Sequence, residues 1–474
     1  MKKYLVRSIG ENKGKPRIFL DSLLLSVAGF LPGKTYNRTV SQEGQRITLT
    51  VCPNGTHVVC RKEKAGTEIP VIDINSAKAL APFEGMQAVR VVVMDNQILI
   101  LALASEVNRK ERLQRLQKNL DAGTVTTAGI SFGGGVLDHA AHAGLHDAGI
   151  HANLAFANEI DADLLEHAST HNDIWRKDTI GLAAPMQELV QDAAAMQRLP
   201  QVDVLCAGIP CSGASRAGKA KRGLDMMEAH PQVGHLVASA LMVINRIQPA
   251  VVVIENVELY SDSASAHILR NHLRDSGYVV RETVLDASEF GSLEARVRWF
   301  MVAASAGIDI DLQDLAPKLK PVRTMAEILD PIGPDAHDWR TFDYLKAKEV
   351  RDAAKGNVFA MQTVSQDSTS CGTLRKGYAK GGSTDPLLKH PTDPDLLRQF
   401  TVAEHARIKD VPEQLVADLS KVDGHALLGQ GVAYKPVRAL FRRIGEGITN
   451  WHRQLAAQTS TQRTLGYDLQ LATG

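Results

Sequence analysis

The chain has 474 residues, 44% of them hydrophobic, which is enough to form two or three globular domains with ordinary cores. Its 54 Lys and Arg residues nearly balance 53 Asp and Glu residues, which excludes a global positive field as the basis of nucleic-acid binding. The five cysteines include no CxxC pair, so neither a disulfide framework nor a zinc site is expected, and a reducing cytoplasm is the predicted setting.

Residues 1–104 alternate between apolar and polar side chains in short runs separated by turn residues, including the pair Asn54-Gly55. This pattern predicts a small β-rich domain, to which the sequence assigns no role. The most apolar stretch, 89–104, is divided at Asp95 into two strand-length runs, each too short to span a bilayer. We therefore expect no signal peptide and no membrane partner.

The rest of the chain alternates between strand and helix patterns. Residues 105–120 are rich in Arg, Lys, Leu and Gln, which predicts a helical linker. Over residues 121–305, short β-branched runs alternate with helical segments, which predicts a Rossmann-like α/β domain with a mainly parallel, doubly wound sheet. Residues 306–396 are richer in Pro, Gly and Thr and form a candidate recognition region. The remaining segments are a helical C-terminal part, 397–458, and a tail, 459–474.

A glycine-rich turn, SFGGGVLDH over residues 131–139, lies between a predicted strand and a predicted helix, where a ligand can approach the backbone. The next strand ends at Glu159, where an acidic side chain can accept both hydroxyls of a ribose. Asp178 follows and is placed in the next loop, as a candidate acceptor for an adenine amino group. GGGV is not the dinucleotide fingerprint GxGxxG, and no phosphate-binding Lys-Ser/Thr follows. These features favour S-adenosylmethionine over NAD or ATP.

The stretch DVLCAGIPCSGAS, residues 203–215, predicts a buried strand that runs into a loop at a sheet edge, where α/β enzymes place their chemistry. Cys211 follows a proline in this loop and is a candidate nucleophile, because nearby Arg and Lys side chains would favour its thiolate. Glu255 ends another apolar strand, VVVIENV, where a carboxylate can meet a substrate ring held against the thiol. Arg296 and Arg298 are predicted on one face of a later strand by its period of two.

The order of these motifs, a glycine-rich loop, a Pro-Cys pair after a strand, ENV and then RxR, resembles the cytosine-C5 methyltransferases. The segments FTVAEHARIKDVP and LLGQGVAYKPVRALFRRI resemble the last helical segment and the final motif of that family. The resemblance covers about residues 124–305 and 397–450, and it implies that the intervening stretch is the variable target-recognition domain. It does not extend to residues 1–104.

This resemblance implies S-adenosylmethionine-dependent methylation of cytosine C5 in a specific sequence of double-stranded DNA. Cys211 would add to C6 of the ring, and Glu255 would bind N3 and the exocyclic amine. Arg296 and Arg298 would bind the base carbonyl and orient Glu255, and the target base would be flipped out of the duplex. The residues implied for the cofactor are Phe132, Gly134, Glu159, Asp178, Gly208, Gln430 and Val432. The residues expected to contact DNA are Ser212, Arg216, Lys219, Lys221, Arg222, Arg375, Lys376 and Tyr378, the last three around a tract, 376–385, predicted to be an exposed loop.

Three positions depart from the family pattern. Ser212 follows the cysteine in place of Gln, Glu294 precedes RxR in place of Gln, and Gln430 stands in place of Asn. A derivative of S-adenosylmethionine therefore stays open as the methyl donor.

Other readings of the chain are compatible with part of this pattern. A tRNA substrate and a catalytically silent DNA-binding regulator of the same fold are the alternatives, whereas a nicotinamide oxidoreductase fails on the missing fingerprint. A cognate restriction endonuclease is a candidate partner. No metal is expected, and His139, His142 and His146 are assigned to the surface or core of a helix.

Overall fold

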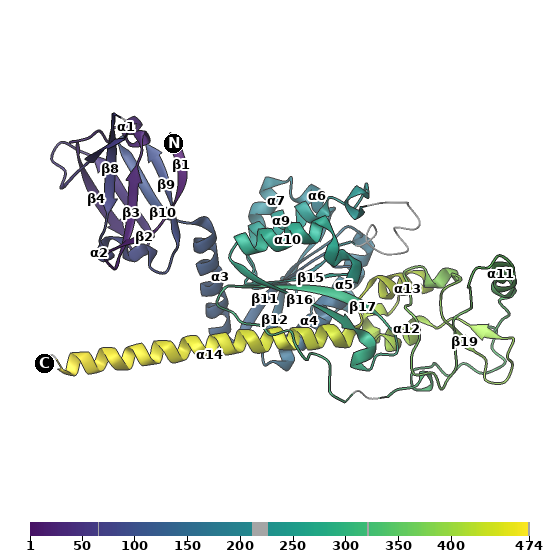
Figure 1. Cartoon of the computed structure of the whole chain (residues 1–474). Helices are drawn as coiled ribbons and strands as arrows, with labels where there is room; N and C mark the ends of the chain where they lie inside the picture. Colours follow the sequence, from purple (N-terminus) through teal and green to yellow (C-terminus); the bar gives the residue numbers. More distant parts are fainter. Residues whose placement is uncertain (65, 211–225, 320–321, 473–474) are drawn as a thin grey trace. The chain divides into compact units, whose positions relative to one another are not determined.

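The computed structural model describes residues 1–64, 66–210, 226–319 and 322–472, with only the backbone of residue 24 and of 459–472. The chain divides into two compact units, Met1–Glu111 and Arg112–Gly474, and the helix α3 (Ala104–Asp121) crosses this boundary. Figure 1 labels many of the helices and strands of both units. No helix among these described residues is long and apolar enough to cross a membrane.

The first unit consists of two β-sheets that share an apolar core. One sheet has the order β1 (Lys3–Ser8), β9 (Ala88–Met94), β10 (Gln97–Ala102), β5 (Arg46–Val51), β4 (Thr35–Ser41) and β6 (His57–Val58). The other has the order β2 (Gly10–Asn12), β3 (Lys15–Asp21), β8 (Thr67–Ile74) and β7 (Cys60–Lys64), and two short helices are α1 (Leu23–Val27) and α2 (Ala77–Leu80). Alternate strand residues such as Ile18, Ile47, Ile72 and Ile100 are buried, because successive side chains of a strand point to opposite faces. The predicted β-rich N-terminal region is confirmed.

The second unit is built on a seven-stranded sheet. Its order is β13 (Ile180–Ala183), β12 (His151–Glu159), β11 (Thr124–Ile130), β14 (Val204–Gly208), β15 (Val251–Asn256), β17 (Val297–Ser305) and β16 (Tyr278–Asp286). The strands from β13 to β15 are parallel, whereas β17 is antiparallel to both of its neighbours. The helices that flank the sheet or connect its strands include α4 (Val136–Asp147), α5 (Ala162–His171), α6 (Met186–Leu189), α7 (Ala193–Arg198), α9 (Leu236–Ile247), α10 (Ala264–Asp275) and α14 (Tyr434–Ala472). The predicted Rossmann-like α/β fold is confirmed.

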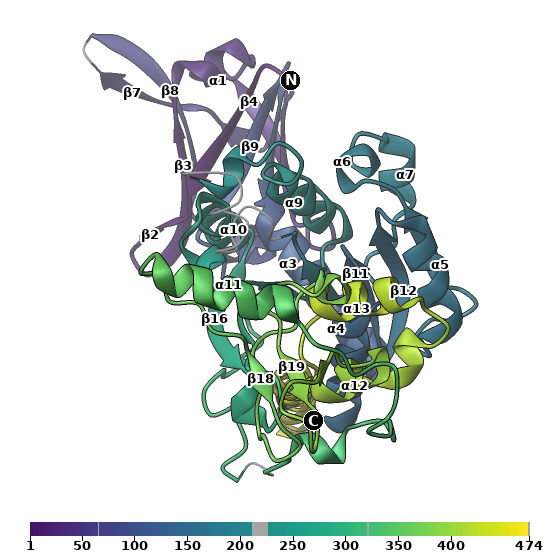
Figure 2. The same ribbon diagram turned by 90° about the vertical axis from the view of Figure 1, so that its right-hand side faces the viewer.

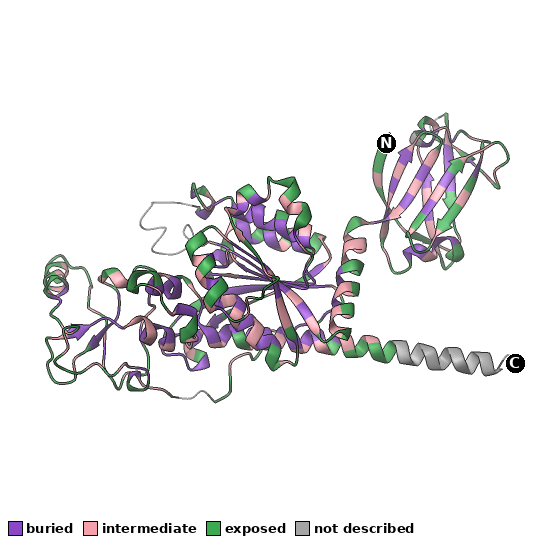
Figure 3. Cartoon of the chain, turned by 180° about the vertical axis from the view of Figure 1, so that it is seen from behind, coloured by how far each residue is buried: buried purple, intermediate pink, exposed green. Residues whose placement is uncertain are grey.

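Helices cover both faces of this sheet (Figures 1 and 3). Consecutive residues of β15 belong to different cores: Val251 packs on the side of α4 and α14, and Val252 packs on the side of α9 and α10. A strand that is buried on both faces is a near-continuous apolar run, as the sequence predicts here. α4 and α14 approach closely at Gly144, where a Cβ atom would lie 2.3 Å from the carbonyl oxygen of Arg438.

The segment between β17 and α14 forms a smaller body with its own core (Figure 2). It contains α11 (Asp343–Ala354), a three-stranded sheet of β18 (Thr363–Val364), β19 (Leu387–Lys389) and β20 (Leu397–Arg398), and the helices α12 (Val402–Ile408) and α13 (Lys421–Gln430). Tyr378 is fully buried in this core, and its hydroxyl donates to the Pro386 carbonyl at 2.8 Å and accepts from the Phe400 amide at 2.9 Å. The prediction of an exposed loop over 376–385 is therefore wrong at Tyr378, which anchors the tract.

Candidate active site

The parallel strands bring three of the predicted site residues to one edge of the sheet. β12 ends at Glu159, β14 ends at Gly208, and Glu255 is the last residue but one of β15. Gly208 and Glu255 are direct neighbours in the register of β14 and β15. Because parallel strands present their carboxyl ends at the same edge, the glycine-rich loop that follows β11 belongs to this edge as well.

Glu255 forms an ion pair with Arg298 of β17. The Arg298 Nε atom lies 3.0 Å from Glu255 Oε1, and only 14% of the Glu255 side chain is exposed. Burial raises the pKa of Glu255 above its ordinary value, although the positive charges of Arg298, Arg296 and Lys409 oppose this shift. A buried carboxyl group with a raised pKa at the carboxyl edge of an α/β sheet is typical of a functional site.

Asn256, the residue after Glu255, ties β15 to the end of β14. Its side-chain Nδ2 donates to the Ile209 carbonyl at 3.0 Å, and its Oδ1 accepts from the Val257 amide at 2.9 Å. The side chain is almost fully buried. The ENV motif therefore fixes the backbone that leads to Pro210, in addition to supplying Glu255. Cys211, the predicted nucleophile, follows directly but lies outside the described residues.

Arg296 is buried just before β17 and contacts a different set of partners from Arg298. Its Nη2 donates to the Gly429 carbonyl at 3.0 Å, and its Nη1 lies 3.4 Å from Glu294 Oε1. Gly429 is also the point where α13 meets residues 375 and 376, because a Cβ atom there would lie 2.3 Å from the Arg375 carbonyl carbon. Arg296 thus connects the carboxyl edge of the sheet to the C-terminal segment and to the smaller body.

Glu294 and Lys409 form a fully buried ion pair beside Arg296, with Lys409 Nζ 3.3 Å from Glu294 Oε2. Glu294 Oε1 accepts from the Leu374 amide at 2.8 Å, and Lys409 Nζ donates to the Gly431 carbonyl at 3.3 Å. Burial and the charge of Arg296 lower the pKa of Lys409 to about 7, against the opposing effect of Glu294. Sequence reasoning noted Glu294 only as a departure and missed Lys409, because its partner lies far away in the chain.

The glycine-rich loop is held by Glu159. Glu159 Oε2 accepts from the Gly133 amide at 2.7 Å, and Oε1 accepts from the Ile160 and Asp161 amides at 2.9 and 3.2 Å. Gly135 has a φ of +75°, and a Cβ atom there would lie 2.4 Å from both Phe132 and Asn172, so only glycine fits. The buried Phe132 ring, 6.0 Å from that of Trp175, forms part of the floor beneath this loop.

Three more of the residues predicted for the cofactor are Asp178, Gln430 and Val432. The position of Asp178 differs from the expectation, because β13 begins after it: Ile180 pairs with Phe156 in the middle of β12, and Ala183 reaches the carboxyl edge beside Glu159. Asp178 therefore lies toward the opposite end of the strand, with its side chain 79% exposed and 3.2 Å from Arg176. The exposed Gln430 accepts from Lys376 at 3.1 Å, and the buried Val432 lies against Arg296 and Arg298 around a small cavity.

The residues predicted to contact DNA fall into two groups. Ser212, Arg216, Lys219, Lys221 and Arg222 lie outside the described residues. In the second group, Tyr378 is fully buried in the core. Arg375 donates to the buried Asp385 through Nε at 3.0 Å and Nη2 at 2.8 Å. Lys376 is exposed beside Gln430 and keeps its ammonium group at the surface.

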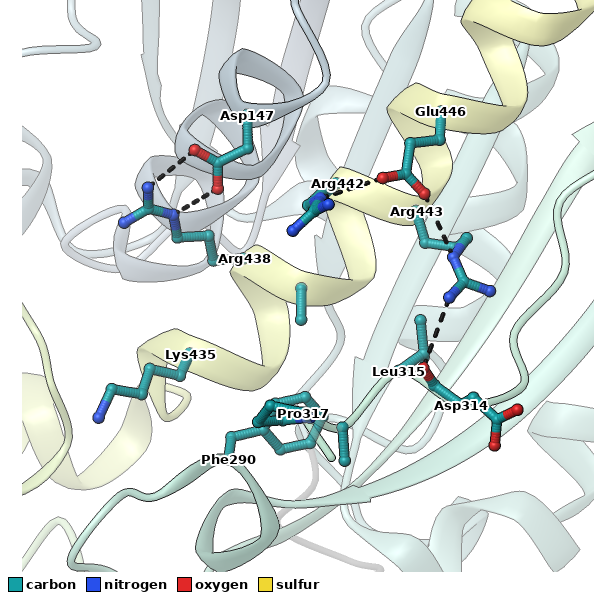
Figure 4. Close-up of a pocket in the computed structure, with 12 residues that line it drawn as sticks. Asp147, Phe290, Asp314, Leu315, Pro317, Lys435, Arg438, Arg442, Arg443 and Glu446 are labelled. Carbon is teal, nitrogen blue, oxygen red and sulfur yellow. Dashed lines mark hydrogen bonds and ion pairs between the residues drawn. The ribbon is translucent and has the colours of Figure 1, made fainter. Parts of the chain in front are cut away.

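A cavity of about 470 Å³ opens along α14 (Figure 4). Lys435, Arg438, Arg442 and Arg443 line it, and each forms an ion pair with a carboxylate: Arg438 with Asp147, Lys435 with Asp410, and Arg442 and Arg443 with Glu446. Because three carboxylates face these four cations, most of the positive charge of the cavity is already paired.

Comparisons with known proteins agree with this arrangement. The family model for "C-5 cytosine-specific DNA methylase" matches residues 139–446. The chain is 25% identical over 268 residues to the type II methyltransferase M.MspI of Moraxella sp., an alignment that covers 54% of this chain and 59% of the relative. It is 26% identical over 261 residues to the tRNA (cytosine(38)-C(5))-methyltransferase of Schizosaccharomyces pombe, covering 50% of this chain and 75% of that enzyme.

Solved structures give the same fold. The S. pombe Dnmt2 methyltransferase has a TM-score of 0.52 at 20% identity, over 67% of this chain and 97% of that one. The family match covers more than half of the chain, and it contains Glu255, Arg296 and Arg298. The chain therefore belongs to the C-5 cytosine-specific DNA methylase family.

Proposed function

We propose that this protein transfers a methyl group from S-adenosylmethionine to C5 of cytosine in a specific sequence of double-stranded DNA. The observation that carries the proposal is the ion pair between Glu255 and Arg298, 3.0 Å apart at the carboxyl edge of the sheet. Its neighbour Gly208 ends the strand that leads into Pro210-Cys211. A nucleophile, a ring-binding carboxyl and a guanidinium would then meet at one edge.

In this proposal the thiolate of Cys211 adds to C6 and forms an S–C6 bond, which makes C5 nucleophilic. Glu255 binds N3 and the exocyclic amine of the same ring. Its raised pKa favours the protonated form, which can donate to N3 as negative charge develops there. Arg298 holds the carboxyl in place and binds the base carbonyl. Loss of the C5 proton and elimination of the thiolate then release Cys211.

The residues of the glycine-rich loop fit S-adenosylmethionine. A Cβ atom at Gly133 would meet open space, the apolar Phe132 ring borders the loop, and Glu159 supplies carboxylate oxygens that can accept from ribose hydroxyls. When bound, this group supplies the electrophilic methyl for C5. S-adenosylmethionine contains a ribose but no phosphate. This agrees with the loop sequence, which contains no Lys or Arg to bind a phosphate.

Recognition of DNA is proposed for residues 306–396 together with the loop 212–223. A base inside a duplex is out of reach of a thiol, so the target must be flipped out, at a cost of about a few kcal/mol. The exposed Lys376 is our candidate phosphate contact in the described part of this region. Because the similar type II methyltransferases come from bacteria, a cognate restriction endonuclease is a proposed partner.

The test is bisulfite sequencing of host DNA from cells that express this chain, with Cys211→Ala as the matched control. We expect cytosines in one short motif to resist conversion only with the intact enzyme. Absence of protection in both cultures would refute DNA methylation.

A tRNA substrate is the second candidate, because one similar protein is a tRNA (cytosine(38)-C(5))-methyltransferase. Purified enzyme with labelled methyl donor should modify duplex DNA and leave total tRNA unlabelled under the proposal made here. A covalent complex with duplex DNA that contains 5-fluorocytosine in the protected motif would exclude a silent DNA-binding regulator.

A further inference from the structure

The N-terminal unit carries an excess of positive charge. Residues 1–111 contain 16 Lys and Arg against 10 Asp and Glu, whereas residues 112–474 contain 38 against 43. The near-neutral total therefore hides a formal charge of about +6 on the first unit and about −5 on the second. The family match begins at residue 139, so it assigns no role to this basic unit.

Part of this charge lies on the outer face of the four-stranded sheet. Ile18 and Leu20 of β3 and Ile72 of β8 point into the core, so the alternate residues of these strands point outward. The outward residues include Phe19, which is partly exposed. We call this surface the basic face; it consists of Lys15, Arg17, Phe19, Lys62 and Lys64, together with Lys13 in the turn between β2 and β3.

Two cations of the basic face are organised around Phe19. The Arg17 guanidinium carbon lies 4.4 Å from the ring centroid, and Lys62 Nζ lies 5.6 Å from it. Arg17 also donates to Asp73 at 2.9 and 2.8 Å, and Lys62 pairs with Asp21. These contacts hold two long side chains in fixed positions on a pleated surface, which lowers the entropy lost when they bind a ligand.

The other three cations of the face remain available. Lys13, Lys15 and Lys64 are exposed, and among the residues that the structure describes none of the three has a carboxylate within ion-pair distance. Asp73 pairs with Arg17 and Asp21 pairs with Lys62 on this face. The five cations of the face therefore exceed these two carboxylates by about three positive charges. An excess spread over a strand surface matches a row of phosphates better than a single small anion.

We infer that the basic face binds the phosphate backbone of duplex DNA without reading its sequence. The inference rests on the proposed function in one respect: we choose DNA over other polyanions because DNA is the proposed substrate of the second unit. A weak contact of this kind on the same chain raises the effective concentration of DNA near the second unit. It also gives the N-terminal unit a role that needs no catalytic residue.

The test measures binding of the full-length protein to a random-sequence 30-base-pair duplex by fluorescence anisotropy, over 50 to 200 mM salt. The variant K13A/K15A/K64A removes the three unpaired cations. The matched control, K3A/K34A/R46A, removes three exposed cations on or next to β1, β4 and β5 of the other sheet. Circular dichroism checks that both variants fold.

We expect the plot of log affinity against log salt to be less steep by about 2.7 for the face variant, because each phosphate that is no longer neutralised by a lysine lowers the slope by about 0.9. The affinity ratio of wild type to variant would then fall about 40-fold between 50 and 200 mM. The control should retain the wild-type slope. Equal slopes for the two variants would overturn the inference. Bisulfite sequencing reports on methylation independently, so failure here and failure of the proposed function are distinguishable.

Discussion

Separate removal of Glu294 and Lys409 should destabilise the second unit, whereas removal of both together should not. With Lys409 Nζ 3.3 Å from Glu294 Oε2, an effective dielectric constant of about 20 gives an attraction of about 5 kcal/mol when both groups are charged. A buried charge left without its partner costs about 3 to 5 kcal/mol, whereas replacing the whole pair with uncharged side chains is often neutral. We therefore expect Glu294→Gln and Lys409→Met to be strongly coupled.

The coupling should depend on pH. The pKa of Lys409 is lowered from its ordinary 10.5 to about 7, so in the folded protein the ammonium is charged at pH 6 and largely neutral at pH 9. A coupling energy of about 3 to 5 kcal/mol at pH 6 should fall to about 1 kcal/mol at pH 9, the value of an ordinary hydrogen bond. Because the folded pKa is depressed, wild type should also gain stability relative to Lys409→Met as the pH rises from 7 toward 10.

Urea unfolding followed by tryptophan fluorescence measures these energies in the right part of the chain. All four tryptophans lie within residues 112–474, so the signal reports on the second unit alone. The exposed pair of Arg442 and Glu446 is the matched control, since an exposed ion pair on one helix should show coupling below about 1 kcal/mol at either pH. Additive effects of the two buried substitutions at pH 6, or a coupling energy that does not change with pH, would refute the reasoning.

Three further predictions concern single residues. Glu255→Gln should lower kcat by roughly 100- to 1000-fold with little change in DNA affinity. The amide keeps a contact with Arg298 but cannot supply a proton to the ring. Methyl-transfer kinetics measure kcat, and fluorescence anisotropy measures DNA affinity. Glu159→Ala removes the acceptor of three backbone amides, those of Gly133, Ile160 and Asp161. It should weaken S-adenosylmethionine binding at least about tenfold, as measured by calorimetry. An unchanged affinity would show that Glu159 has a purely structural role. Tyr378→Phe should lower the free energy of unfolding in urea by about 1 to 3 kcal/mol and leave DNA affinity unchanged. Unchanged stability with weaker DNA binding would instead make Tyr378 a DNA contact.

The parts of the site that sequence could predict are those defined over a few neighbouring residues. A run such as VVVIENV has a strand pattern and a carboxylate at its end, and parallel strand order then carries Glu255 to the same edge as the glycine-rich loop. The alternation in 296–298 likewise predicted two arginines on one face of a strand, and the family resemblance implied that they orient Glu255. The structure adds that Arg298 forms an ion pair with Glu255 and that Arg296 donates to the Gly429 carbonyl.

The predictions that failed depended on where a short element begins or on contacts made far along the chain. Asp178 was assigned to the cofactor because the four-residue edge strand β13 has no pattern strong enough to show that it starts after this residue. Tyr378 lies in a tract of glycine, lysine and alanine that is typical of an exposed loop. Its burial depends on Phe400, which is 22 residues away. Local composition carries no information on such a partner.

The pair of Glu294 and Lys409 is a further case, since the two residues are 115 positions apart and neither segment indicates the other as its partner. Physical chemistry gives little reason to bury such a pair for stability, because apolar side chains of similar volume would serve as well. The positions of its contacts suggest another role: Glu294 binds the Leu374 amide, Lys409 binds the Gly431 carbonyl, and Arg296 lies between them and Gly429. If the pair serves to orient Arg296, the double variant should retain its stability and lose kcat, whereas a purely structural pair predicts that both are retained.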